Sequence, residues 1–272
     1  TFEVMERGGI PFEKKEIDYE TFKKQKQITD LTKANDSTNV FNLSVSKLDE
    51  SGLKEIARFG NLKGLSIYAE NLEAIPNEIF ELDLYELVLT VKQTNSIDLS
   101  GLTQFKNLHV LKMHVESDAT LPVDFSVFKE LKTLSLSGFK NPVSISALPT
   151  ESLSTLYFMN LTKLEGVDGN FSAYKKLGKL KFKQIKEFDM PQRFLGNMWE
   201  FELNPGPYST MPDMSALKLA RVRIETYTGE ILPENFSSGL KEGCQIMFPR
   251  AMYKSKPYKK MKKMGFQVFP KQ

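Results

Sequence analysis

An apolar pattern, L-x-x-L-x-L, recurs nine times along most of the chain and constrains its fold more than any other feature. The copies start 21 to 24 residues apart. Their first residues are Val40, Leu62, Leu84, Leu108, Leu131, Leu153, Leu177, Met198 and Leu219. Nine copies in one register are very improbable by chance, so the chain is built from repeats of about 22 residues.

Each copy predicts a short β-strand with one buried face, because positions 4 and 6 of the pattern are apolar and alternate side chains of a strand point to opposite faces. One repeat cannot bury that face alone, so consecutive repeats stack as parallel strands over a shared core. An apolar residue thirteen positions after the start is followed by proline in five of seven repeats, which predicts an interrupted returning segment. Aromatic residues near the repeat ends should stack as an inner spine. These residues are Phe59, Phe80, Phe105, Phe128, Tyr174, Phe194 and Phe236.

The segments LKGLSIYAENLEAIPNEIFEL and LHVLKMHVESDATLPVDFSVFKEL resemble leucine-rich repeats, and the resemblance covers residues 40–269. It implies an α/β fold, a curved leucine-rich-repeat solenoid. The parallel β-sheet would form the concave face, and short helices, 3-10 turns and loops the convex face. The chain lacks the family's asparagine at position 9, so we expect packing or water to hold the turns after the strands. It also lacks cysteine-rich caps, which favours a bacterial or intracellular member, and it resembles an irregular bacterial-type one.

The repeats predict an N-terminal cap region at residues 1–37 and a solenoid at residues 38–272, with about ten repeats of 21–24 residues. The alternative for residues 1–37 is a disordered lead-in. The last unit, residues 241–269, is expected to act as a C-terminal cap.

Continuing the register into this last unit predicts two more strands. Cys244 and Ile246 take positions 4 and 6 of one strand, and Phe266 and Val268 take those positions in the next. Between the strands we expect a helix that is capped by Ser255 and closes at Gly265. Its buried side would contain Tyr258, Met261 and Met264.

The net charge of +3 conceals an uneven distribution. Residues 250–272 contain eight basic residues and no acidic one, whereas residues 1–249 carry −5. Helical spacing places the lysines between residues 256 and 263 on the outer side of the capping helix. Two interpretations stay open for them, a solvated face or contact with acidic lipid or nucleic acid.

Few residues could support catalysis. Cys244 is the only cysteine, which excludes an intramolecular disulfide, and its register points the thiol into the core. His109 and His114, the only histidines, have no evident third metal ligand. No phosphate-binding loop and no catalytic motif occurs. We therefore expect no enzyme, no catalytic residue, no metal and no cofactor.

Positions 3, 5 and 7 predict the exposed face of the strands. In the first six repeats the side chains at these positions are mostly small and nearly neutral. In the last three repeats they are charged, and each strand carries a row of mostly like charges, here called a stripe. The candidate ligand-binding residues on the concave face are Tyr68, Tyr85, His114, Tyr157, Lys179, Lys181, Lys183, Trp199, Glu200, Glu202, Arg221 and Arg223. The stripes predict either cross-strand ion pairs or a recognition patch with Trp199 as an aromatic anchor.

The resemblance favours non-catalytic macromolecular recognition, with protein–protein interaction through the concave sheet of a bacterial secreted or surface protein. The alternative is a glycan- or host-binding adhesin or effector that uses the concave-face aromatic residues. We expect an unknown protein partner, or else a glycan, and no nucleic acid.

The compartment is predicted only indirectly. The chain contains no run of about 18 apolar residues, so no transmembrane segment is expected. It starts at Thr1 rather than methionine, so we expect a processed or missing N-terminal segment. This favours an extracytoplasmic location, whether secreted, periplasmic or lipoprotein-anchored, with the cytoplasm as the alternative.

Overall fold

The computed structural model describes residues 4–7, 10–34, 39–92, 96–122, 124–145 and 147–270. The chain divides into two compact units. Unit 1 comprises residues 1–133 and 138–141, and unit 2 comprises residues 134–137 and 142–272. No helix among the described residues is long and apolar enough to cross a membrane.

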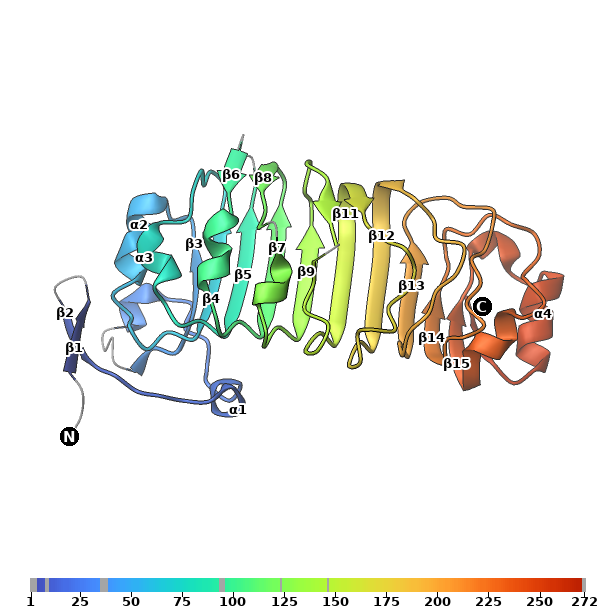
Figure 1. Ribbon diagram of the computed structural model, residues 1–272, viewed down its shortest axis with the longest axis horizontal. Coiled ribbons are helices and arrows are strands. Elements are labelled where there is room, and N and C mark those ends of the chain that lie inside the picture. The colour runs from blue at the N-terminus through green and yellow to red at the C-terminus, as the bar shows by residue number, and fades with distance from the viewer. Residues whose placement is uncertain are drawn as a thin grey trace. The chain divides into compact units, whose positions relative to one another are not determined.

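Unit 1 contains a parallel sheet preceded by a short antiparallel hairpin (Figure 1). The hairpin consists of β1 (Val4–Arg7) and β2 (Ile10–Glu13), and the helices α1 (Tyr19–Phe22) and η1 (Leu31–Lys33) follow it. The sheet order is β3 (Asn42–Ser46), β4 (Gly64–Ala69), β5 (Glu86–Val91) and β7 (Val110–Val115). The returning segments contain α2 (Glu50–Ile56), α3 (Asn77–Phe80), β6 (Ser96–Asp98), η3 (Ser100–Gln104), β8 (Asp118–Thr120) and η4 (Phe125–Val127).

Unit 2 continues the pattern of one strand per repeat. Its strands in sheet order are β9 (Thr133–Ser137, whose first residue belongs to unit 1), β11 (Thr155–Glu165), β12 (Lys179–Phe188), β13 (Glu200–Asn204), β14 (Leu219–Arg223), β15 (Leu240–Met247) and β16 (Gln267–Phe269). The short β10 (Val143–Ser144) pairs with the end of β11. The remaining elements are η5 (Phe236–Gly239), η6 (Arg250–Met252) and α4 (Lys256–Lys263).

The predicted register holds within each unit. Leu65 of β4 pairs with Leu43 on one side and Leu87 on the other, so position 4 aligns across consecutive repeats. These side chains are fully buried. In unit 2, Phe182 aligns with Phe158 and with Leu203 at position 6. Stacking of equivalent positions therefore forms the core of each unit, as the repeat predicts.

The predicted aromatic spine is present, with one exception. Six of the seven aromatic side chains near the repeat ends are buried: Phe59, Phe80, Phe105, Phe128, Phe194 and Phe236. Within unit 1, the rings of Phe80 and Phe105 lie 5.5 Å apart. Tyr174 is only half-buried and packs against Phe171, because its hydroxyl favours a position near solvent.

Backbone hydrogen bonds between neighbouring repeats close the turns after the strands. The Lys47 amide donates to the Tyr68 carbonyl (3.0 Å), and the Glu116 amide, directly after β7, donates to the Val91 carbonyl (3.0 Å). Position 8 is left-handed in four repeats, at Lys47, Gly138, Asn160 and Gln184. The expectation that packing or water would hold these turns is therefore wrong, because the main chain supplies both donor and acceptor.

The C-terminal helix forms as predicted, except at its end. The Ser255 hydroxyl accepts a hydrogen bond from the Tyr258 amide (3.3 Å), and Gly265 takes a left-handed φ of 89°. Tyr258 and Met261 are buried, but Met264 is 49% exposed. The prediction for Met264 is wrong because the helix ends at Lys263, so the next residue no longer follows the helical period.

A register shift explains why Lys241 occupies an expected leucine position. Leu219 pairs with Leu240, whereas Arg221 pairs with Gln245, so β15 contains three more residues than β14 between the paired positions. Lys241 lies in this irregular part and is exposed. Beyond it, Ile246 pairs with Val268, as the sequence predicts.

Candidate binding surface

The outward face of the unit 1 strands is contacted by residues 12–34, here called the N-terminal segment. Phe22 is fully buried against Gly64 of β4. A Cβ atom at position 64 would lie only 2.6 Å from the Phe22 ring, so the close approach requires glycine. The Gln27 amide nitrogen lies within hydrogen-bonding distance of the side-chain oxygens of Asn42 (3.2 Å) and Ser66 (3.3 Å).

Tyr19 anchors the middle of the N-terminal segment. Its ring stacks on His109 with centroids 4.0 Å apart, and its hydroxyl donates to the Glu86 carboxylate (3.0 Å). Burial raises the pKa of Tyr19 well above its ordinary value, and the charge of Glu86 adds to that shift. The hydroxyl therefore stays protonated and keeps its role as a donor.

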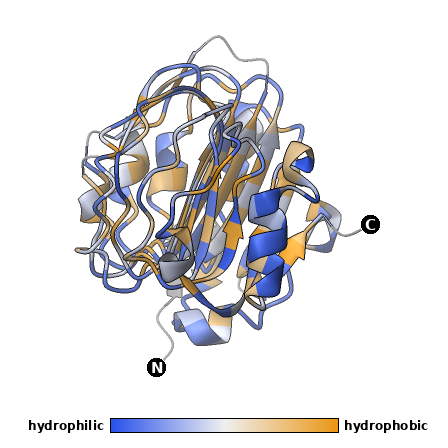
Figure 2. Cartoon of the chain, turned by 90° about the vertical axis from the view of Figure 1, so that its right-hand side faces the viewer, coloured by the Kyte–Doolittle hydropathy of each residue, from blue (hydrophilic) through white to orange (hydrophobic). Residues whose placement is uncertain are grey.

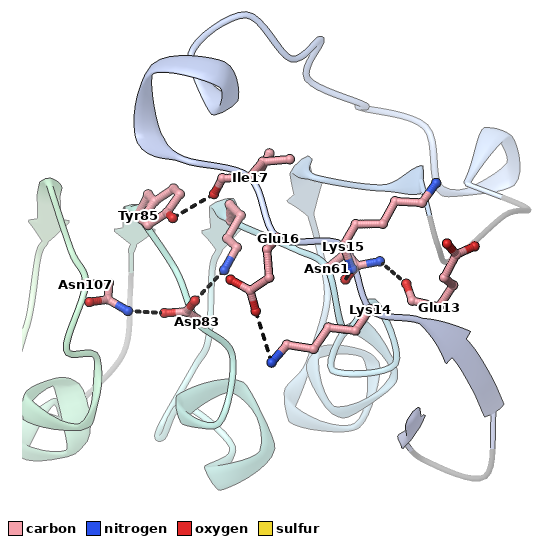
Figure 3. Close-up of polar contacts among 10 residues, drawn as sticks. Glu13, Lys14, Lys15, Glu16, Ile17, Asn61, Asp83, Tyr85 and Asn107 are labelled. Carbon is pink, nitrogen blue, oxygen red and sulfur yellow. Dashed lines mark hydrogen bonds and ion pairs between the residues drawn. The ribbon is translucent and has the colours of Figure 1, made fainter. Parts of the chain in front are cut away.

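Further polar contacts bind the start of the segment (Figure 3). The Tyr85 hydroxyl donates to the Ile17 carbonyl (2.8 Å). The buried Asn61 side chain donates to the Glu13 carbonyl (2.6 Å) and accepts from the Lys15 amide (2.8 Å), as a neighbouring strand would. These contacts hold residues 13–17 against unit 1, whereas the N-terminal cap at residues 1–37 stays a prediction, and its boundary with the solenoid at residue 38 lies outside the described residues.

A buried lysine lies beside Tyr85. Lys63 forms an ion pair with Asp83 and lies 5.0 Å from the centre of the Tyr85 ring. Asp83 also accepts a hydrogen bond from Asn107 (2.6 Å; Figure 3). Burial alone would raise the pKa of Asp83, but the hydrogen bonds from Lys63 and Asn107 outweigh it and hold the pKa below its ordinary value. Asp83 thus stays ionised and compensates the buried ammonium group.

The three candidate ligand-binding residues of unit 1 have different environments. The Tyr85 hydroxyl is used by the N-terminal segment, as described above. His114 lies 2.8 Å from the Glu116 carboxylate. Tyr68 is 47% exposed and borders a shallow hollow of about 230 Å³. Of these three side chains, Tyr68 is therefore the aromatic one whose ring is most accessible to a ligand.

The other nine candidate residues gather at four adjacent strands of unit 2, β11 to β14: eight lie on the strands and Trp199 directly precedes β13. We call them the charged face: Tyr157, Lys179, Lys181, Lys183, Trp199, Glu200, Glu202, Arg221 and Arg223. The register aligns Lys179 with Glu200 and Glu200 with Arg221. Charges of opposite sign therefore alternate across neighbouring strands.

The predicted cross-strand ion pairs are confirmed. The Lys181 ammonium lies 3.2 Å from the Glu202 carboxylate. Glu200 accepts from Arg221 (3.4 Å) and lies 3.9 Å from Lys179. Glu202 is only 4% exposed, whereas its neighbours remain partly solvated, so the pair with Lys181 is the most desolvated one on this face.

Two of these lysines make cation–π contacts with aromatic rings. Lys181 lies 4.8 Å from the centre of the Tyr157 ring, and Lys179 lies 5.0 Å from that of Trp199. Burial raises the pKa of Tyr157, and the charges of Glu200 and Glu202 raise it further. Trp199 is 40% exposed and packs against Gly178, where a Cβ atom would lie 2.5 Å from the indole nitrogen.

Two cations of the charged face have no carboxylate partner among the residues that the structure describes. They are Lys183 at the end of the β12 stripe and Arg223 on β14. Both flank β13, where Asn204 donates to Glu202 (3.2 Å) and lies 3.4 Å from Glu225. The charged face therefore has an excess of positive charge beside a buried polar network.

Sequence reasoning omitted Asn204 and Gln245 from the candidates. Asn204 is buried and accepts from the Thr226 amide (3.2 Å), and Gln245 accepts from the Arg221 guanidinium (3.1 Å). Asn204 lies at position 7 of its repeat and Gln245 at position 5, so both belong to the positions that predict the exposed face of the strands. They were missed because neutral amides give no charge signal.

Cys244 is a poor candidate nucleophile. Its side chain is buried, and burial raises the pKa of the thiol to about 12. The reactive thiolate is therefore scarce at neutral pH.

Comparison with known proteins adds little beyond the fold. No protein-family model matches the sequence, and no curated protein matches it. A solved leucine-rich-repeat protein of Leptospira interrogans is similar to 82% of this chain over 78% of its own length. The two share 17% sequence identity with a TM-score of 0.40.

The geometry of the chain decides the fold, with one parallel strand per repeat and short helices or 3-10 turns in the returning segments. The chain has a leucine-rich-repeat fold. Leucine-rich repeats generally serve in protein interactions, but a fold does not by itself set the function or the ligand of a chain.

Loss of the Lys181 side chain is expected to destabilise unit 2. Lys181→Met leaves Glu202 desolvated without its cation, and we expect a loss of about 2 kcal/mol, below the cost for a fully buried pair because Lys181 is partly solvated. Urea denaturation followed by Trp199 fluorescence measures the change. Lys179→Met is the matched control and should cost under about 1 kcal/mol. Equal losses in both variants would contradict this assignment.

Proposed function

We propose that the chain is a non-catalytic binding protein that holds an acidic segment of a partner protein on the charged face. The observation that supports this most is the pair of cations, Lys183 and Arg223, for which the described part of the chain offers no carboxylate partner, although the neighbouring cations are paired. Carboxylates of a partner would complete the charge pattern. Trp199, which lies directly before β13 and beside Lys179, offers a 40% exposed aromatic ring on the charged face, a residue type enriched at energetic centres of interfaces.

The difference between the two units favours unit 2 as the binding region. In unit 1 the outward positions of β3, β4 and β5 already contact the N-terminal segment. In unit 2, side chains of the charged face such as Lys179, Arg221 and Trp199 retain substantial exposure. A partner can reach these without displacing a packed segment.

Titration with a synthetic glutamate-rich peptide tests this proposal. Trp199 is the only tryptophan, so its emission reports directly on the charged face. We expect a saturable change in emission that weakens as salt is raised. Lys183→Glu with Arg223→Glu should lower the affinity at least ten-fold, because attraction becomes repulsion. The control, Lys176→Glu with Lys218→Glu, makes the same charge change at exposed positions outside the face and should stay within about two-fold.

Two results would overturn the proposal. One is an unchanged Trp199 emission at saturating peptide, and the other is an equal loss of affinity in the two charge-reversal variants. A lysine-rich peptide of the same length should not bind, and its binding would also contradict the assignment.

Glycan binding is a second candidate, supported by the exposure of Tyr68 beside its hollow. Tyr157 fits this role less well, since the Lys181 ammonium already lies over its ring. Retention on a carbohydrate array that is abolished by Tyr68→Ala and kept by the Lys183→Glu, Arg223→Glu variant would favour the glycan. The bacterial, extracytoplasmic setting is likewise a proposal, which fractionation of the source cells tests.

A further inference from the structure

The C-terminal end of unit 2 carries a dense group of exposed cations, here called the basic patch. It consists of Arg250, Lys254, Lys256, Lys259, Lys260, Lys262 and Lys263. Residues 243–270 contain no acidic residue, and none of the seven cations has a carboxylate partner among the residues that the structure describes. Figure 2, which looks onto the end of the molecule where α4 lies, shows this helix as strongly hydrophilic.

Helix stability does not account for this arrangement. Lys256 and Lys259 lie in the first turn of α4, where the positive end of the helix dipole disfavours cations. Lys259 and Lys263 are four residues apart, so their like charges repel on one side of the helix. Only the last-turn lysines are favoured by the dipole. The positive charge concentrated on α4 therefore does not contribute to the stability of the helix.

The helix that carries most of the basic patch packs against unit 2 through its inner side, and an exposed apolar residue lies beside the patch. Tyr258 and Met261 anchor the inner side of α4, with Tyr258 packed on Phe248 (6.0 Å) and bonded to the Pro270 carbonyl (2.9 Å). Met264 directly follows the last lysine of the helix and is half-exposed. Lysines around an exposed apolar side chain suit an interface where charge meets hydrocarbon.

From these features we propose that the basic patch docks on the headgroups of an anionic lipid bilayer. Six of the seven cations are lysines, which act as flexible point charges and respond to charge density rather than to a fixed fork geometry. The neighbouring Tyr253 ring makes an edge contact with Tyr258 (5.5 Å) and has the Lys254 ammonium 5.1 Å from its centre, so one of its faces is already in use and it is a poor platform for stacking a base. This surface is separate from the charged face and does not depend on its function.

Vesicle co-sedimentation of the whole chain tests the docking. We expect binding to vesicles of phosphatidylcholine mixed with phosphatidylserine, release as salt is raised, and no binding to phosphatidylcholine alone. The change of Lys256, Lys259, Lys260 and Lys263 to glutamine should weaken binding at least ten-fold. It also relieves repulsion within α4, so the variant should fold, which its thermal unfolding checks. Met264→Ser should weaken the binding that persists at higher salt.

Matched variants distinguish binding through the basic patch from non-specific attraction between the whole protein and an anionic vesicle. Glutamine at Lys175, Lys176, Lys186 and Lys218 removes the same charge elsewhere in unit 2 and should change vesicle binding by less than about two-fold. The Lys183→Glu, Arg223→Glu variant should bind vesicles as the parent does. The proposal is overturned if no vesicle binding occurs or if the two glutamine variants lose it equally. It is also overturned if duplex DNA displaces the protein from vesicles and binds it through the same four lysines.

Discussion

Replacement of Phe182 by alanine should destabilise unit 2 by about 4 kcal/mol, the largest effect we expect from one substitution. Phe182 is fully buried, and its ring lies within 6.5 Å of five other phenylalanine rings. These rings belong to Phe158, Phe171, Phe188, Phe194 and Phe201. Removing the ring leaves a cavity and eliminates contacts with all of them at once, because neighbouring repeats cannot collapse into the space without losing their register.

Urea denaturation monitored through Trp199 measures this loss within unit 2. Phe182→Leu keeps most of the volume and should cost under about 1.5 kcal/mol. If alanine costs no more than leucine, the cluster of Phe182 and its five neighbouring rings does not stabilise the unit in the way that its geometry indicates.

Phe22→Ala should release the N-terminal segment from unit 1, with a loss of about 3 kcal/mol. Phe22 is the most deeply buried side chain of this segment and fits over Gly64, where no other residue would leave room for its ring. The loss cannot exceed the free energy that holds the segment in place, since the strands beneath keep their own hydrogen bonds.

Limited proteolysis with trypsin measures the release, because the segment contains several exposed lysines, among them Lys23 and Lys24. Cleavage there should become at least ten-fold faster in Phe22→Ala. Lys132→Ala removes the cation that lies 4.7 Å from the centre of the Tyr19 ring and should have a small effect. An unchanged cleavage rate in Phe22→Ala would show that Tyr19, Tyr85 and Asn61 hold the segment without it.

Features that repeat along the chain could be predicted from the sequence. The alignment of Leu43 with Leu65 follows from a period that brings equivalent residues together in neighbouring strands. The ion pairs between β12 and β13 follow from the same register, as with Lys181 and Glu202. The Ser255 cap is a local signal within a few residues.

Features formed only once were not predictable in this way. The stacking of Tyr19 on His109 joins residues 90 positions apart that share no period. Gly64, at a position where other repeats carry a side chain, was a usable hint of a close approach, but it did not indicate what approaches. The turns after the strands were misjudged because their hydrogen bonds join main-chain atoms, which leave no mark in the choice of side chains.

The N-terminal segment acts on the unit 1 strands as a tethered ligand. A covalent link keeps its effective concentration near the millimolar range, so an outside molecule competes with an occupant that never diffuses away. A competitor for that surface would need an affinity far above what a typical transient contact provides. Evolution or design of new specificity on this chain is therefore least hindered on β11 to β14, where partly exposed side chains meet no such internal competitor among the described contacts.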